Sequence, residues 1–249
     1  MLMKRGQVTV FIVVGVLALV MLFFIISLTS QSSRRDISQE EDLLFAQPVQ
    51  QFAQNCIEKT LHDAIFMVSS QGGFYKTPAP FIEYSYFQIP YYFDNATLIN
   101  PSESLVVPQI DQYLSVNLPI CLGNVSFPGL IITLQVPVSM INIEQNQVVV
   151  DLHWPIEVQK ENSIKIISDF IVTQPVELGS ALLLSQQIIQ EQEKYPDSVR
   201  MSRLTNISAD NNLFIRLYDL NNTVIYALDY PNSTFSPEYV FTFAVKYPW

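Results

Sequence analysis

The stretch "VSMINIEQNQVVVDLHWPIEVQKENSIKIISDFIVTQPV", residues 138–176, decides the fold class of this chain. From Val148 to Ile156 every second residue is apolar. This period of two predicts a strand with one buried face, because successive side chains of a strand point to opposite sides of its sheet. Polar pairs at residues 145–146 and 161–162 predict turns, so we expect an antiparallel meander here.

Helical periodicity occurs on both sides of this meander. Apolar residues at steps of three and four predict helices at residues 48–71, 108–117 and 178–194. Pro119 is expected to end the second of these helices, because proline lacks the backbone N–H that a helix interior needs.

The aromatic stretch "FIEYSYFQIPYYF", residues 81–93, predicts a further strand in which Pro90 marks an edge or an end. The C-terminal part of the chain predicts closing strands, with a hairpin turn at residues 220–222. Helices and strands are interspersed without strict alternation. We therefore expect an α+β domain of antiparallel strands with about three packed helices, over residues 48–249.

Composition and charge argue against several classes of function. The chain has 249 residues, of which 14% are charged, and its net charge is −10 with no basic stripe, so we expect no nucleic-acid partner. The seven glycines form no phosphate-binding loop or dinucleotide fingerprint. The two cysteines and two histidines show no metal-ligand spacing, so we expect neither a cofactor nor a metal.

The N-terminal region predicts a membrane anchor. From Val8 to Leu28 the chain is apolar apart from Thr9 and Ser27. A helix of this length, at about 1.5 Å per residue, crosses a hydrocarbon core roughly 30 Å thick. The run is longer than the apolar part of a secretory signal peptide, which favours an anchor that is retained.

This anchor defines the expected domain organisation. Residues 1–6 form a short basic cytoplasmic leader, residues 7–29 a transmembrane helix, residues 30–47 a polar and acidic stalk, and residues 48–249 an acidic ectodomain. We expect a single-pass protein of the cell membrane whose C-terminal domain is extracellular. The lipid bilayer is then a partner, and the apolar helix offers a contact for a homo-oligomer.

The octet "KRGQVTVF", residues 4–11, resembles the start of archaeal type IV pilin-like proteins, which carry a class III signal peptide. The resemblance covers residues 1–28 and implies cleavage between Gly6 and Gln7 by a dedicated peptidase. Phe11 stands where one subclass of this family has a Glu that seats each subunit in the filament. The remainder of the chain resembles uncharacterised anchored surface proteins of archaea, and this resemblance implies no activity.

Cys56 and Cys121 are expected to form a disulfide if the domain is exported, since an even pair of cysteines outside the cytosol is usually bridged. Buried free thiols are the alternative in a reducing compartment. Sequons for N-glycosylation also follow the predicted anchor. Their acceptor residues are Asn95, Asn124, Asn206, Asn221 and Asn232.

Two features offer candidate sites. Asp151 and His153 share one strand face and, with a serine nearby, would supply parts of a hydrolase site, although a solvated strand face is the simpler interpretation. Exposed aromatic side chains of the stretch 81–93 would instead bind sugars or another protein, the alternative being that they pack in the core. The residues of this aromatic binding face are Tyr84, Tyr86, Tyr91 and Tyr92.

The sequence thus favours an anchored cell-surface protein with a structural, adhesive or binding role, and more readily a non-enzyme than an enzyme. Its partners would be other surface proteins or glycans. A pilin-like filament subunit processed after Gly6 is the first alternative, and a surface hydrolase is the second.

Overall fold

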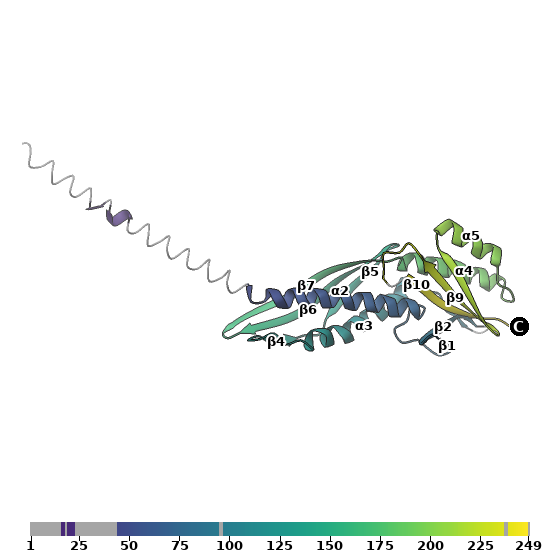
Figure 1. Cartoon of the computed structure of the whole chain (residues 1–249), viewed down its shortest axis with the longest axis horizontal. Coiled ribbons are helices and arrows are strands. Elements are labelled where there is room, and N and C mark those ends of the chain that lie inside the picture. The colour runs from purple at the N-terminus through teal and green to yellow at the C-terminus, as the bar shows by residue number, and fades with distance from the viewer. Residues whose placement is uncertain (1–15, 18, 23–43, 95–96, 237–238, 249) are drawn as a thin grey trace, which may run out of the picture.

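The computed structural model describes residues 16–17, 19–22, 44–94, 97–236 and 239–248. The described part of the domain is elongated and contains four helices beside two β-sheets (Figure 1). The helices are α2 (Gln47–Ser70), α3 (Glu103–Gly123), α4 (Leu178–Lys194) and α5 (Met201–Asn211). The strands are β1 (Phe81–Tyr84), β2 (Phe87–Asp94), β3 (Thr97–Leu98), β4 (Ile131–Leu134), β5 (Val138–Ile143), β6 (Gln147–Lys160), β7 (Ser163–Pro175), β8 (Phe214–Leu220), β9 (Thr223–Tyr230) and β10 (Tyr239–Lys246).

The long hairpin β6–β7 forms the centre of one sheet, as the alternating pattern predicts. β7 pairs with β6 along nearly its whole length, while β4 and β5 share the other side of β6. The predicted turns are confirmed, since Lys160 pairs with Ser163 and Ile143 pairs with Val148. Every second residue of β6 from Val148 to Ile156 is buried.

The second sheet has the strand order β1-β2-β10-β9-β8. The predicted turn at residues 220–222 is confirmed, because Leu220 pairs with Thr223 and Asn221 has a φ of 61°. Most neighbours are antiparallel, but β2 and β10 run parallel, which corrects the expectation of antiparallel strands throughout. Pro90 lies inside β2, opposite Phe81 of β1, so the strand neither ends there nor forms the edge of this sheet.

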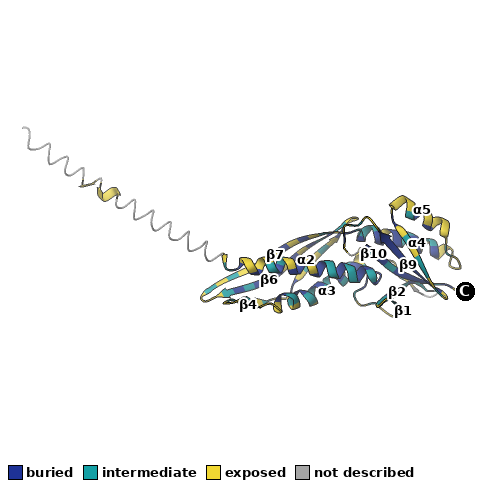
Figure 2. Cartoon of the chain, in the orientation of Figure 1, coloured by how far each residue is buried: buried dark blue, intermediate teal, exposed yellow. Residues whose placement is uncertain are grey.

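A single large core joins both sheets to the helices (Figure 2). α2 buries one face along most of its length, with side chains spaced by three and four residues, and packs on α3, β7 and β10. Its end at Gly72 requires glycine: φ is +55°, and an added Cβ would meet the Thr242 carbonyl oxygen at 2.8 Å. The end of α2 is thereby held closely against the second sheet.

The helix count corrects the expected three. α3 is longer than predicted and contains both Pro108 and Pro119 in its interior. A row of buried residues from Val106 to Leu122, four apart, packs this helix against the core, and that packing outweighs the missing backbone hydrogen bonds. α5 is an additional helix, which buries little besides Leu204 and Ile207 and so gives a weak apolar signal.

The predicted fold class also included a transmembrane helix at residues 7–29, and this part is corrected. Among the residues that the structure describes, no helix combines the length and the apolar composition needed to cross a membrane. Apart from residues 16–17 and 19–22, the segment lies outside the described residues, as do the leader 1–6 and most of the stalk 30–47.

Candidate functional site

The predicted aromatic stretch folds into a hairpin of β1 and β2, which we call the aromatic hairpin (residues 81–94). β1 is an edge strand of the second sheet, and Tyr84 pairs with Phe87 across a two-residue turn. The stretch therefore forms two strands rather than the one predicted.

The turn of the hairpin consists of Ser85 and Tyr86, both at positive φ, of 48° and 74°. Two-residue hairpin turns of this kind usually contain Asn and Gly, because positive φ is sterically unfavourable for most other residues. Tyr86 is nevertheless fully exposed, so no burial of its ring offsets this cost. Backbone outliers of this kind cluster at functional positions, which makes Tyr86 the most informative residue of the hairpin.

Contacts from α2 and the following loop hold the hairpin in place. The Gln71 Oε1 atom accepts the backbone N–H of Gln88 at 3.3 Å, and the Gln71 Nε2 atom donates to the carbonyls of residues 74 and 75. Phe66 of α2 packs edge-on against Phe87, with ring centroids 5.9 Å apart. The Thr77 hydroxyl donates to the Gln88 carbonyl at 2.7 Å. The tip is thus presented on a fixed support.

The outer face of the second sheet continues the aromatic surface. Tyr84 packs against Tyr218 of β8 with ring centroids 5.3 Å apart, and the Tyr91 hydroxyl lies 3.3 Å from that of Thr223. These side chains cover a small apolar cluster centred on Ile89 and are themselves only partly buried. Beside these side chains lies an open surface pocket of about 420 Å³. Its lining residues are Gln71, Glu83, Tyr84, Ser85, Tyr86, Phe87 and Gln88.

The structure brings together three of the four predicted aromatic residues. Tyr84, Tyr86 and Tyr91 belong to this surface, but Tyr92 points to the opposite face and is fully buried. Its hydroxyl donates to the Gly72 carbonyl at 2.9 Å, and burial raises its pKa well above the ordinary value. Tyr92 is thus part of the core. Sequence reasoning missed Tyr218, which lies far along the chain and enters only through strand pairing.

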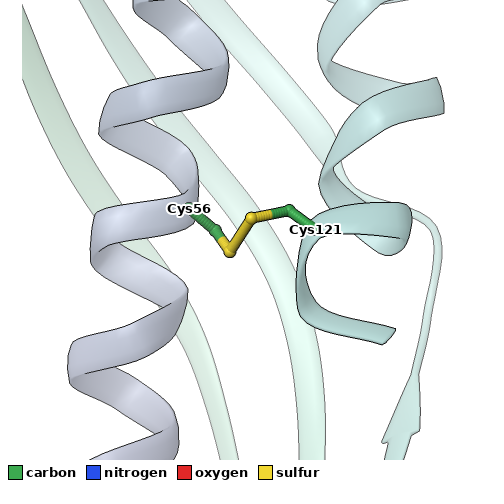
Figure 3. The surroundings of a disulfide bond; sticks show 2 residues. All are labelled: Cys56 and Cys121. Atoms are coloured by element: carbon green, nitrogen blue, oxygen red, sulfur yellow. A yellow bond between two sulfur atoms is a disulfide. The ribbon is translucent and has the colours of Figure 1, made fainter. Parts of the chain in front are cut away.

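Cys56 and Cys121 form the predicted disulfide, which joins α2 to α3 (Figure 3). Their Cα atoms lie 6.0 Å apart, within the usual range for a disulfide. Cys56 belongs to the buried face of α2. The bridge therefore fixes the two packed helices to each other near the C-terminal end of α3.

The predicted modification sites are scattered rather than gathered. The exposed acceptors are Asn124, Asn206, Asn221 and Asn232. Asn95 and the predicted cleavage position between Gly6 and Gln7 lie outside the described residues.

The hydrolase candidate has an unexpected partner. His153 Nδ1 lies 2.8 Å from the Oδ1 atom of Asp169 on β7, whereas Asp151 is one of the exposed residues of the same strand. Ser168 donates its hydroxyl to the Asp169 carboxylate, not to His153, so the serine is not placed for activation by the imidazole. The His153 and Asp169 side chains are 60% and 75% exposed, and this pair is therefore a solvated strand contact.

In the described ranges, no three His, Cys, Asp or Glu side chains gather closely enough to hold a metal ion. Comparisons with known proteins add no relative: no protein-family model, no curated protein and no solved structure matches the chain. Of the candidate sites predicted from the sequence, the aromatic hairpin is the one whose side chains the structure gathers on one surface.

Proposed function

We propose that this chain is an exported cell-surface protein that binds another surface protein through the aromatic hairpin. The observation that carries the proposal is Tyr86, a fully exposed aromatic side chain held at positive φ on the tip of a supported hairpin. Tyrosine is enriched among the residues that dominate protein interfaces, because it buries a large ring while its hydroxyl still finds a partner.

The neighbourhood of Tyr86 fits a protein partner. Tyr84, Tyr91 and Tyr218 offer further half-buried rings on the same sheet face, and Glu83 and Gln88 supply polar groups beside them. β1 is also a sheet edge, so an extended segment of the partner has backbone groups with which to pair.

Export is supported by the disulfide and by the exposed sequons. A bridged pair persists in oxidising compartments and is rare in the cytosol. Protease added to intact cells is expected to degrade the domain. Full protection of the domain in intact cells, with degradation only after lysis, would contradict the proposed location.

Tyr86→Gly separates binding from folding. Glycine adopts positive φ without cost, so the variant is expected to match or exceed the wild-type stability by up to about 1 kcal/mol. Loss of the ring is expected to lower attachment between cells by about tenfold or more, as for a dominant interface residue. Phe214→Ser is the matched control, because Phe214 is an exposed aromatic residue on β8, at the other edge of the same sheet.

A photo-crosslinking amino acid at position 86 tests for the partner in intact cells. We expect a covalent adduct with another surface protein, and none from the same amino acid at position 214. Equal adducts at the two positions, or unchanged attachment by Tyr86→Gly, would refute the proposed binding role.

A further inference from the structure

A polar cavity lies apart from the aromatic hairpin, at the N-terminal end of α4. It has a volume of about 310 Å³, at the lower end of the range for small-ligand sites. Four separate parts of the chain supply its walls, and the lining residues are Asn146, Glu177, Ser180, Leu184, Asn211, Asn212, Tyr230, Asn232 and Ser233.

The wall formed by the β5–β6 turn is packed tightly against α4. At Gly179 an added Cβ would lie 2.4 Å from the Glu144 carbonyl oxygen, so only glycine allows this approach. Ser180 donates both its backbone N–H and its hydroxyl to the Gln145 carbonyl, at 3.2 and 3.0 Å. The Asn146 carbonyl accepts the backbone N–H of Val176 at 3.0 Å. This side of the cavity is therefore formed in advance of any ligand.

The opposite wall is equally fixed. The Ser233 hydroxyl donates to the Glu177 Oε2 atom at 2.5 Å, and the Ser233 backbone N–H donates to the Tyr230 carbonyl at 3.0 Å. Asn212 ends α5 in the left-handed conformation, with a φ of 52°. The loop after β9 is thus held beside Glu177, and the end of α5 completes this side of the cavity.

Several polar groups of these walls have no partner within the described chain. Tyr230 is only 7% exposed, and its buried phenol oxygen makes no hydrogen bond to any described residue. The side chains of Asn146, Asn212 and Asn232 are exposed at the mouth of the cavity, and their amides make no hydrogen bond to a described residue. Buried polar groups are normally satisfied, so this phenol is left for a bound water or a ligand group to complete.

The charge of the lining residues argues against a negatively charged ligand. Glu177 is the charged side chain of the lining, which contains no lysine or arginine, and an anionic ligand is therefore disfavoured. Amide groups both donate and accept, which matches hydroxyl groups that also do both. Burial and the charge of Glu177 raise the pKa of Tyr230, so the phenol remains a donor at neutral pH.

We propose that this cavity binds one unit of a neutral, hydroxyl-rich sugar. Glu177 accepts a hydrogen bond from a sugar hydroxyl, Tyr230 donates to a sugar oxygen, and the amides of Asn146 and Asn212 bridge the remaining hydroxyls. This site is separate from the aromatic hairpin, and its test does not depend on the proposed protein partner.

The test uses the full-length protein with glucose, galactose, mannose and N-acetylglucosamine as probes, measured by saturation-transfer NMR and by titration. We expect a millimolar or tighter Kd for at least one sugar. Glu177→Gln is expected to weaken binding by about tenfold, because a hydrogen bond to a charged group is lost, and Tyr230→Phe by about threefold.

Asn212→Gly protects the test against misfolding. Glycine suits the left-handed conformation at this position, so the variant keeps the fold while it removes one amide, and it is expected to weaken binding. Glu193→Gln, at an exposed position near the C-terminal end of α4, is the matched control and leaves sugar binding unchanged. The proposal is overturned if none of the four sugars binds, if putrescine binds in their place, or if the three cavity variants bind as tightly as the wild type.

Discussion

Removal of the Cys56–Cys121 bridge is expected to lower the free energy of unfolding by about 2–4 kcal/mol. The bond spans 65 residues of sequence, and closing a loop of that length in the unfolded chain costs roughly 4 kcal/mol in conformational entropy. α2 and α3 also pack along each other, so residual order in the unfolded chain reduces the effect below this figure. The double variant Cys56→Ala, Cys121→Ala leaves no single thiol to react.

Equilibrium unfolding in urea, followed by circular dichroism and tryptophan fluorescence, measures the effect. The midpoint should fall, and the slope m should rise, because an unfolded chain without the cross-link exposes more surface. Wild-type protein kept in reductant is the control and should behave like the double variant. A loss below about 1 kcal/mol with an unchanged slope would refute the reasoning that the bridge acts by restricting the unfolded chain.

Two further predictions concern single residues. Gly72→Ala should destabilise the fold by well over 1 kcal/mol, whereas Gly129→Ala should cost only about 1 kcal/mol. Both glycines have positive φ, but of the two only Gly72 has neighbouring atoms within contact of an added Cβ. Equal unfolding midpoints of the two variants in urea would contradict this reasoning. Hydrogen bonds from Ser168 and His153 lower the pKa of Asp169, so this interaction stabilises the fold above the unfolded pKa of the carboxyl and is lost as the pH falls through the folded value. Carboxyl-carbon NMR should show Asp169 titrating below the ordinary aspartate range, and Ser168→Ala should move the midpoint upward; an unmoved midpoint would exclude the hydroxyl as the cause.

Long, regular patterns could be predicted because a single physical rule governs them. β6 buries every second residue, and α2 and α4 bury residues three and four apart, so burial alone specifies these elements. α3 could not be delimited in this way, because Pro119 locally opposes a helix that distant packing stabilises.

Pairing between distant segments was the other part that the sequence does not reveal. The parallel contact of β2 with β10, and the meeting of Tyr84 with Tyr218, depend on which strands become neighbours. The polar cavity could not be predicted either. Glu177 and Tyr230 stand in local sequences without a recognisable motif, and they line one cavity only because separate segments of the chain meet in the fold. The aromatic stretch was recognisable by composition, but the conformation of Tyr86 was not, because a Ser-Tyr turn carries no usual hairpin signal.

The placement of α2 gives the domain a mechanical property. A pulling force that enters at Gln47 acts along the helix axis, and the helix is packed lengthwise on β7 and β10. The contacts of α2 must then break simultaneously, in shear, instead of one after another. The disulfide at Cys56 transfers part of the force to α3. Traction applied through this end of the domain is therefore resisted by the whole length of the helix before any strand is stretched.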